Sequence, residues 1–313
     1  MPNNPSHTPH GREDRPTLWG IDMGGTKIEG AIVDANEPTS VIRRVRMPTE
    51  SERGYDHIVG RVAAVVAELE TQSGMARPSV IGVGTPGTTE PLTGAIKNAN
   101  TVSLNGRPLG TDLSHALGAE ARLSNDANCF ALAEATLGTA KGAGVVIGLI
   151  LGTGVGSGIV VDGRVLAGLH GIAGEWGHNP MRDEATPCYC GRAGCVETVI
   201  SGPALERFFE SRTGRQATLP EIDRRASAGD AAATETIDRL VAKFGEAIAA
   251  VINILDPDAI VIGGGAGNSN RLYSVDTRMA ILRHLFNPEL RTRLLRPTLG
   301  DSAGVFGAAL LSR

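Results

Sequence analysis

The sequence is poor in several features that define large classes of protein. Aromatic residues make up only 4% of its 313 residues, there are four cysteines, and no apolar run reaches the length of about 20 residues that a membrane-spanning helix needs. Positive charge is not in excess either. The net charge is -4, so nothing attracts the chain as a whole to nucleic acid or to an acidic membrane. Neither is expected as a partner.

The N-terminal segment also lacks a recognisable targeting signal. Residues 1–16 are polar and rich in proline and asparagine, without the apolar stretch of a signal peptide. We predict a disordered tail over residues 1–16 and a cytoplasmic protein. Hydrophobic residues at 41% and charged residues at 20% are typical of a globular chain, and the length suits two modest domains or one large one.

Glycine, by contrast, is abundant, with 41 residues, and some of it recurs in a pattern. Residues 18–35 and 145–162 each read as an apolar strand, a glycine-rich turn and a second apolar strand. Displacing the chain by 128 residues matches five of fifteen positions between Gly20–Asp34 and Gly148–Asp162. Chance matching at this glycine content is the alternative. A duplication would give two related lobes that face a cleft.

Hydrophobic periodicity predicts the remaining framework. Helices are expected at residues 55–73, 203–212, 231–255 and in the C-terminal stretch AGVFGAALLS, and strands at 79–84, 121–124 and 259–262. A further helix is expected to start at Asn125-Asp126, where either side chain suits an N-cap.

Two glycine-rich turns are candidates for phosphate binding. The first, from Asp22 to Lys27, offers close backbone N–H groups, a hydroxyl, a lysine charge and a carboxylate that suits water-bound Mg²⁺. The second is Gly152-Thr153-Gly154-Val155-Gly156. Plain hairpin turns are the alternative for each. A Rossmann frame at Gly82, Gly84 and Gly87 is rejected, because the residues that follow cannot open a helix.

Three of the four cysteines fall within eight residues. Together with an upstream histidine they offer the Cys3His set of a structural zinc site: His178, Cys188, Cys190 and Cys195. A reduced loop without metal is the alternative. Glu175 and Glu197 flank this loop and would be held rigidly enough to accept sugar hydroxyl groups, unless they are ordinary surface glutamates.

Asn125 and Asp126 stand at a strand-to-helix junction. An aspartate there can accept a hydroxyl proton as the oxygen attacks phosphorus, although a simple N-cap is the alternative.

Taken together, these segments resemble the ROK family (repressors, open reading frames and kinases). The resemblance rests on DMGGTK, GTPG, SNDANC, LGTGVGSG, GEWGH, CYCGRAGCVE and IVIGGG, in this order from about residue 18 to residue 313. It implies an actin-like, hexokinase-like α/β ATPase fold with two lobes around a central cleft. The expected parts are a small lobe over 17–124, joined by the C-terminal helix at about 303–313, and a large lobe over 125–302.

The resemblance also implies roles for individual residues. Asp126 is the expected catalytic base and a sugar contact. Other expected sugar contacts are Gly87, Asn100, Asn125, Glu175, His178 and Glu197. The expected nucleotide contacts are Asp22, Gly24, Gly25, Thr26, Lys27, Gly152, Thr153, Gly154, Gly263, Gly264 and Gly265.

The implied activity is an ATP-dependent hexose kinase with Mg²⁺ and structural Zn²⁺, acting on a 6-hydroxyl, and a homodimer is expected. The segments around residues 94–114 and 173–180 resemble bacterial fructokinases of the manno(fructo)kinase type, so D-fructose, and also D-mannose, are the expected substrates. Glucokinase and N-acetylhexosamine kinase are the alternatives. A sugar-binding repressor and a sugar sensor are the non-kinase alternatives. The few residues before the first strand and the intact DMGGTK turn and Asp126 count against them.

Overall fold

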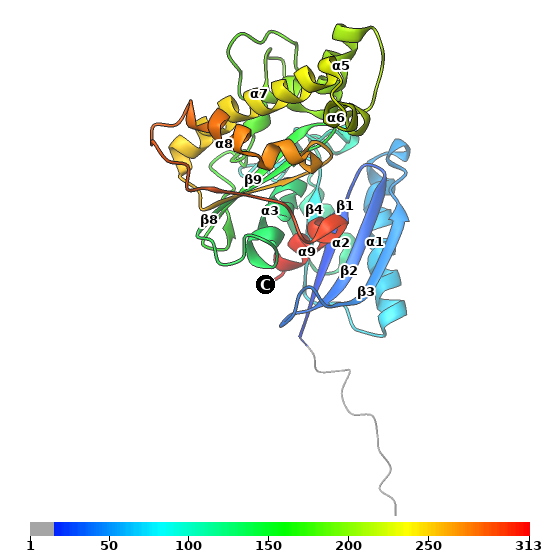
Figure 1. Cartoon of the computed structure of the whole chain (residues 1–313). Helices are drawn as coiled ribbons and strands as arrows, with labels where there is room; N and C mark the ends of the chain where they lie inside the picture. The colour runs from blue at the N-terminus through cyan, green and yellow to red at the C-terminus, as the bar shows by residue number, and fades with distance from the viewer. Residues whose placement is uncertain (1–15) are drawn as a thin grey trace, which may run out of the picture.

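The computed structural model describes residues 16–313 (Figure 1). The predicted tail over residues 1–16 therefore lies, apart from Pro16, outside the described residues. Two five-stranded sheets form the framework, and helices cover both of them. None of the helices within 16–313 is long and apolar enough to cross a membrane.

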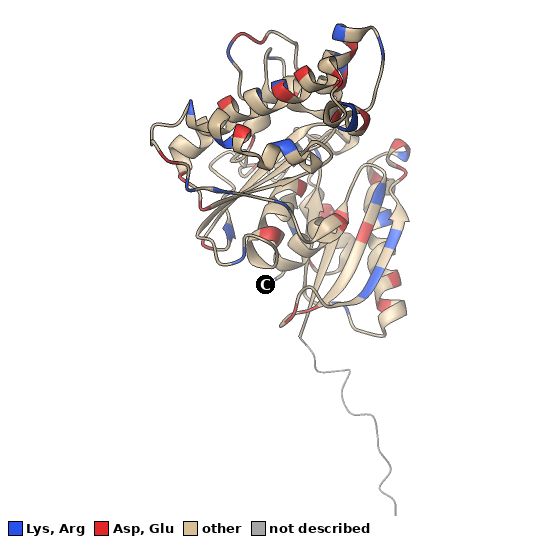
Figure 2. Ribbon diagram, viewed as in Figure 1, with Lys and Arg blue, Asp and Glu red and all other residues tan. Residues whose placement is uncertain are grey.

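The first sheet has the strand order β3-β2-β1-β4-β7. β1 pairs antiparallel with β2 and β2 with β3, whereas β4 runs parallel to β1 and β7 parallel to β4. Its strands are β1 (Thr17–Met23), β2 (Lys27–Asp34), β3 (Val41–Pro48), β4 (Val80–Thr85) and β7 (Glu120–Asn125). Arginines line the edge strand β3 (Figure 2), where charge discourages pairing with another sheet.

The second sheet repeats this plan in the order β10-β9-β8-β11-β12. β8, β9 and β10 form the antiparallel half, and β11 and β12 run parallel to β8. Its strands are β8 (Val145–Leu151), β9 (Val155–Val161), β10 (Arg164–Val165), β11 (Ala259–Gly263) and β12 (Arg293–Leu295). A small hairpin, β5 (Thr88–Thr89) with β6 (Ile96–Lys97), stands apart from both sheets.

The identical order and direction of the strands agree with the duplication predicted from the sequence. One detail of that prediction is wrong, however. Gly20 pairs with Ala31, whereas its counterpart Gly148 pairs with Gly158. The second hairpin is therefore one residue tighter, and the offset of 128 residues holds for β1 and β8 but not for the strands that follow them.

The helices pack in three groups around these sheets. They are α1 (Tyr55–Ser73), α2 (Leu109–Leu117), α3 (Asp126–Thr136), α4 (Val196–Ile200), α5 (Gly202–Thr213), α6 (Leu219–Ser227), α7 (Ala231–Leu255), α8 (Val275–Leu282) and α9 (Ala303–Leu310). Short 3-10 helices occur at Ser51–Arg53, Val102–Leu104, Trp176–His178, Ala266–Asn268, Asn270–Tyr273 and Gly300–Ser302. α1 and α2 cover the outer face of the first sheet, α4–α8 cover the outer face of the second, and α3 and α9 lie between the sheets (Figure 1).

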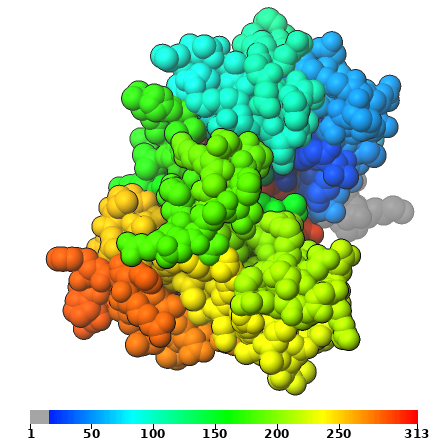
Figure 3. Space-filling view, turned by 90° about the horizontal axis from the view of Figure 1, so that it is seen from above, coloured from blue at the N-terminus to red at the C-terminus, as the bar shows by residue number. Residues whose placement is uncertain are grey.

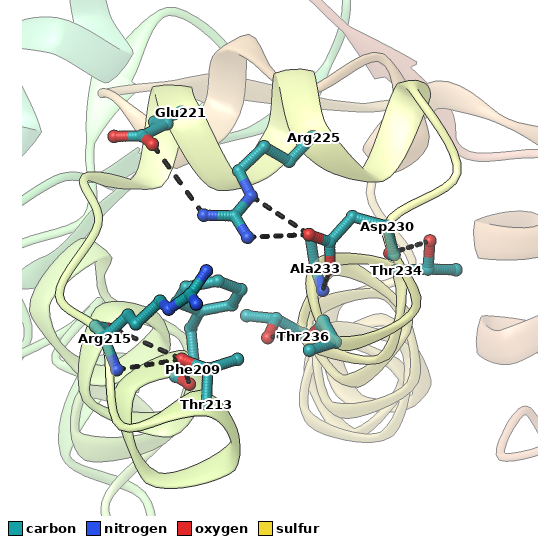
Figure 4. Close-up of polar contacts among 10 residues, drawn as sticks. Phe209, Thr213, Arg215, Glu221, Arg225, Asp230, Ala233, Thr234 and Thr236 are labelled. Atoms are coloured by element: carbon teal, nitrogen blue, oxygen red, sulfur yellow. Dashed lines mark hydrogen bonds and ion pairs between the residues drawn. The ribbon is translucent and has the colours of Figure 1, made fainter.

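The predicted helices and strands are confirmed with small shifts at their ends. α1 and α7 have the predicted bounds, and the apolar residues at helical spacing in α1 are buried: Ile58, Val62, Val65, Val66 and Leu69. α7 starts where it does because Asp230 caps it: Oδ1 accepts the N–H of Ala233 at 3.0 Å, and Oδ2 accepts Nη2 of Arg225 at 2.7 Å (Figure 4). The rejection of a Rossmann motif also holds, since β5 and not a helix follows Gly87.

Glycines let α3 and α9 approach each other and the sheets closely. A Cβ on Gly307 of α9 would lie 1.8 Å from the carbonyl oxygen of Cys129 in α3. Likewise, a Cβ on Gly82 of β4 would lie 1.8 Å from the carbonyl oxygen of Ala308. The two central helices therefore touch along their backbones, and this contact joins the two halves of the molecule. The lobe boundary at residues 124/125 stays a prediction.

We expect Gly307→Ala to destabilise the protein by about 3 kcal/mol, because the new methyl group must push α9 away from α3. Gly60→Ala is the matched control. Gly60 lies exposed inside α1 with nothing within 4 Å of its Cβ position, so alanine should stabilise by about 0.5–1 kcal/mol. Urea unfolding of both variants measures the difference. Equal stabilities would contradict the proposed contact.

Candidate functional site

A cavity of about 210 Å³ lies between the two halves of the molecule. Both sheets contribute to its wall. In a space-filling view the surface is hollowed between the blue and cyan residues of the first half and the green residues of the second (Figure 3). The cavity is lined by Pro86, Gly87, Asn98, Asn100, Asn125, Asp126, Ala127, Ile150, Gly152, Thr153, Gly154, Val155, Gly156, Ser157, Glu175, His178, Tyr189 and Glu197. The structure thus brings all seven predicted sugar contacts together.

Asn125 and Asp126 stand where β7 passes into α3. Asn125 is the N-cap, and its Oδ1 accepts the N–H of Asn128 at 2.7 Å. That bond leaves its Nδ2 as the group for a ligand in the cavity. Asp126 is the first residue of the helix, and its Oδ1 accepts the N–H of Ala127 at 2.8 Å. Of the two candidate caps, Asn125 therefore has that role, and the carboxylate of Asp126 faces the cavity.

The carboxylate of Asp126 is enclosed by protein on most sides, although its outer surface is open to the cleft. This burial raises its pKa above the usual aspartate value, and the N–H of Ala127 offsets part of the rise. Asp22, at the end of β1, has its pKa raised to about 6, first by burial and then by the charges of Asp126 and Glu29. Two carboxylates of like charge thus lie close enough to interact, and a divalent cation bound between them would relieve this repulsion.

Glu175 and Glu197 approach from the second half of the molecule. Oε2 of Glu197 accepts the N–H of Val155 at 2.9 Å, so this carboxylate is tied to the glycine turn between β8 and β9. A Cβ on Gly154 would lie 2.6 Å from the same oxygen, which explains the glycine there. Burial raises the pKa of Glu175, and the charges of Asp126 and Glu197 raise it further, while His178 lowers it.

His178 connects the cavity with the cysteine loop. Its Nδ1 lies 3.6 Å from Sγ of Cys188, and its Nε2 lies 3.0 Å from the hydroxyl of Tyr189. Trp176, two residues earlier, is buried and donates its indole N–H to the carbonyl of Ala247 in α7 at 3.2 Å. The ring of His178 is therefore anchored from the core, with one nitrogen toward the thiols and the other toward the cavity.

The predicted zinc ligands come together. The ligand atoms of His178, Cys188, Cys190 and Cys195 all lie within 4.8 Å of one another. Sγ of Cys190 lies 3.6 Å from Sγ of Cys195. Tetrahedral Zn²⁺ with bonds of about 2.3 Å to sulfur places its sulfur ligands about 3.8 Å apart, so the spacing fits this ion.

An asparagine-rich loop forms the opposite wall of the cavity. Asn105 holds this loop by both backbone groups of one residue: its Oδ1 accepts the N–H of Ala99, and its Nδ2 donates to the carbonyl of Ala99, both at 2.9 Å. Asn98 adopts a left-handed conformation with φ of 58°. The clamp by Asn105 therefore places Asn98 and Asn100, which flank Ala99, beside the cavity.

The predicted nucleotide contacts divide into two groups. Gly152, Thr153 and Gly154 line the cavity. The turn at Gly263–Gly265 does not, but it lies against Leu151, the residue before Gly152. A Cβ on Gly264, whose φ is 81°, would lie 2.5 Å from the backbone of Leu151. The residues of the other turn, Gly24, Gly25, Thr26 and Lys27, do not line this cavity. Their link to it is the interaction of Asp22 with Asp126.

Reasoning from the sequence missed several residues of the wall. Asn98 carried a signal, because it belongs with Asn100 to the polar run KNAN. Tyr189 stands between two predicted metal ligands, and this position was sufficient to place it near the site. Ser157 carried no signal, since only the pairing of β9 turns its hydroxyl to the carbonyl of Gly174.

Two sheets of the same strand order, joined through central helices and separated by a cleft, define this protein as a two-lobed α/β protein of the hexokinase-like fold. The chain belongs to the ROK family, whose sequence pattern matches residues 18–313.

Similar proteins agree with this assignment. The chain is 36% identical over 303 residues to N-acetyl-D-glucosamine kinase of Pectobacterium atrosepticum, with 94% of this chain and 98% of that protein covered. A ROK hexokinase of Thermus thermophilus has a similar structure, with a TM-score of 0.84 and 34% identity. The match covers 95% of this chain and 98% of that one. A ROK family glucokinase of Streptomyces griseus, in complex with glucose and AMPPNP, gives a TM-score of 0.77 and 27% identity, with coverage of 95% and 99%.

The resemblance to ROK family sugar kinases is therefore confirmed, together with the predicted fold. The assignment to the fructokinase subgroup is not confirmed, because similar proteins, among them that of Pectobacterium atrosepticum, are N-acetyl-D-glucosamine kinases.

We expect the purified protein to contain about one zinc ion per chain without added metal, bound by His178, Cys188, Cys190 and Cys195. Cys190→Ser should lose most of this zinc, since serine is a poor ligand for it. His170→Ala is the control, because His170 is exposed in a neighbouring loop outside the cluster. Elemental analysis of the three proteins decides. Metal retained in full by Cys190→Ser would contradict the ligand set.

Proposed function

We propose that this protein is an ATP-dependent kinase that phosphorylates the 6-hydroxyl of an N-acetylhexosamine, with N-acetyl-D-glucosamine as the preferred substrate. The observation that carries the proposal is the carboxylate of Asp126. It faces a polar cavity lined by asparagines and glutamates, directly beside the glycine turn of the second sheet. The sequence favoured D-fructose, but the identity to N-acetyl-D-glucosamine kinases over nearly the whole chain supports the N-acetylated sugar better.

In the proposed complex the sugar occupies the cavity. Asn100 and the Nδ2 of Asn125 hydrogen-bond its hydroxyl groups, and the backbone of Gly87 lies against it. Glu175, Glu197 and Nε2 of His178 hold the end that is distant from the 6-hydroxyl. The hydroxyl of Tyr189 lies 3.0 Å from the same nitrogen. The sugar would either displace this hydroxyl or bind beside it. Carboxylates are strong hydrogen-bond acceptors for sugar hydroxyl groups, which explains their concentration in one wall.

The nucleotide would lie across the cleft. The backbone N–H groups of Gly25, Thr26, Thr153 and Gly154 suit its phosphates. Lys27 adds a positive charge, and Gly263–Gly265 suits the adenosine side. Asp22 would hold Mg²⁺ through water, and this ion neutralises phosphate charge when it is bound.

Asp126 then accepts the proton of the 6-hydroxyl as that oxygen attacks the γ-phosphorus and the bond to ADP breaks. The raised pKa of Asp126 makes it a better proton acceptor than an exposed aspartate, provided that the pH is high enough to ionise it. Closure of the lobes would exclude water, which otherwise competes with the sugar for the phosphoryl group.

Three further parts, expected from the family resemblance, complete the proposal. The zinc ion is structural, because four protein ligands fill its tetrahedron, and it holds the loop that carries Glu175 and Glu197. The lobes divide near residue 125, with α9 completing the first. The protein is a homodimer.

A sugar-binding regulator is the second candidate within this family. It would require Glu175 and Glu197 but no general base. The position of Asp126, with its raised pKa, favours the kinase over this candidate.

In an ADP-release assay over a panel of sugars, we expect the highest kcat/KM with N-acetyl-D-glucosamine, at least about tenfold above D-fructose, since a site that binds an amide discriminates against sugars without one. D-Mannose, D-glucose and N-acetyl-D-mannosamine complete the panel. If kcat/KM is highest with D-fructose, the proposed substrate is wrong and the fructokinase assignment is supported instead. No turnover with any hexose would favour the regulator.

We expect Asp126→Asn to lower kcat by about 10²–10⁴-fold while sugar binding stays nearly intact, because the variant keeps the shape of the base but not its basicity. Asp256→Asn is the control, since Asp256 is an exposed, left-handed C-cap far from the cavity, where asparagine fits equally well. Steady-state kinetics and sugar titrations measure both. Near-normal turnover in Asp126→Asn would exclude its catalytic role.

The pH dependence has a defined sign. Only the ionised carboxylate of Asp126 accepts a proton, and its pKa is raised, so kcat/KM of the wild type should fall on acidification at a pH above the usual range of an aspartate. A profile that stays flat down to about pH 4 would contradict the proposed base.

A further inference from the structure

The turn between β1 and β2 is held from outside by one residue, Thr49. Its Oγ1 donates to the carbonyl of Gly24 at 2.6 Å, and its backbone N–H donates to the carbonyl of Thr26 at 2.9 Å. Thr49 is only 1% exposed. The carbonyl groups of Gly24 and Thr26 are therefore directed toward Thr49, while the carbonyl of Lys27 accepts the N–H of Gly24 and closes the turn.

Because the carbonyl groups of Gly24 and Thr26 are fixed, the N–H groups of the residues that follow them are fixed as well. In a planar trans peptide the C=O of one residue and the N–H of the next point in opposite directions. The carbonyl of Gly24 points to Thr49, so the N–H of Gly25 points away from it. Within residues 16–313, no hydrogen bond occupies the N–H of Gly25 or of Thr26. A Cβ on Gly25 would lie 3.4 Å from Oγ1 of Thr101, so this part of the turn faces the asparagine-rich loop of the cavity wall.

Thr49 is itself firmly placed. It follows Pro48, the last residue of β3, whose carbonyl accepts Nε of Arg61 in α1 at 3.0 Å. Glu50, which comes next, adopts a left-handed conformation with φ of 51°. Its carboxylate binds Nε2 of His57 at 2.9 Å. These contacts hold the segment after β3 against α1. The position of Thr49, and through it that of the turn, therefore depends on α1.

The duplicated turn of the second sheet is held in the same way. Gly152 corresponds to Gly24 under the offset of 128 residues, and its carbonyl accepts the N–H of Gly202, the first residue of α5, at 2.9 Å. The same carbonyl of both turns is thus bound by an element outside the hairpin. In the second sheet the donor is backbone, whereas in the first it is the hydroxyl of Thr49, which a substitution can remove.

We propose that Thr49 is a positioning residue for nucleotide phosphates: by binding the carbonyl group of Gly24 it directs the free N–H of Gly25 toward the phosphates, and by binding the carbonyl group of Thr26 it holds the end of the turn in place. This inference rests on the proposed function, in which the turn binds ATP. Thr49 does not touch the nucleotide, and its effect should be confined to ligands that carry phosphate.

The test compares Thr49→Val with Thr49→Ser. Valine keeps the shape and the backbone N–H but leaves the carbonyl of Gly24 without its hydroxyl donor, whereas serine keeps the donor. We expect Thr49→Val to raise KM for ATP and Kd for ADP about five- to tenfold, because one hydrogen bond of this kind contributes about 1 kcal/mol. KM for the sugar, and the affinity for adenosine, should stay within about twofold of the wild type. Thr49→Ser should restore ATP binding.

Each result has one meaning. A Thr49→Val protein that binds ADP like the wild type would overturn the inference. Equal losses for ADP, adenosine and sugar would also overturn it, because they would show a general structural role, and thermal unfolding would then report a lowered Tm. A wild type without ATP turnover would refute the proposed function itself. Wild-type kinetics with a selective loss of phosphate-bearing ligands in Thr49→Val supports both.

Discussion

The contact between α3 and α9 is the constraint on which the rest of the structure depends. It exists because Gly307 has no side chain where the carbonyl of Cys129 passes. α3 begins with the residues of the cavity, Asn125 and Asp126, and the first turn of α9 passes so close to Asp22 that a Cβ on Gly304 would lie 2.6 Å from its Oδ2. This backbone contact therefore reinforces the approach of the two aspartates, which the strand order of the first sheet brings about, and it joins the two sheets, because helices this close cannot move apart independently.

The same packing concentrates negative charge in a partly desolvated cleft. Asp22, Asp126, Glu175 and Glu197 all approach one region, and the pKa values of the first three are raised. Such an arrangement costs free energy in the empty protein and is typical of a site that a cation and a polar ligand complete. In each glycine turn an element outside the hairpin binds the carbonyl of the first glycine, which leaves the N–H of the next residue free to act as a donor.

Much of the framework was accessible from the sequence because local rules decide it. The bounds of α1 and α7 follow from apolar periodicity and capping, and the clustering of His178 with the three cysteines of its loop follows from their spacing alone. The weaker segments were not accessible. β10 and β12 have two and three residues, too few for a period, and α8 has no clear apolar stripe, so their existence depends on the partners they pack against. The sequence also did not predict that the second hairpin is one residue tighter, because strand register follows from pairing and not from glycine positions.

The sequence by itself determined which chemical groups this protein carries and in which local structures they stand: a carboxylate at a helix start, two glycine turns, and four ligands in one loop. Only the tertiary structure decided that these groups meet. Asp22 and Asp126 are far apart in the chain and interact because β1 and β7 belong to one sheet. Thr49 reads as an unremarkable loop residue, and only the pairing of β3 beside β2 brings its hydroxyl to the carbonyl of Gly24. Contacts between distant residues depend on which strands pair and which helices pack together, and local sequence patterns do not specify these pairings.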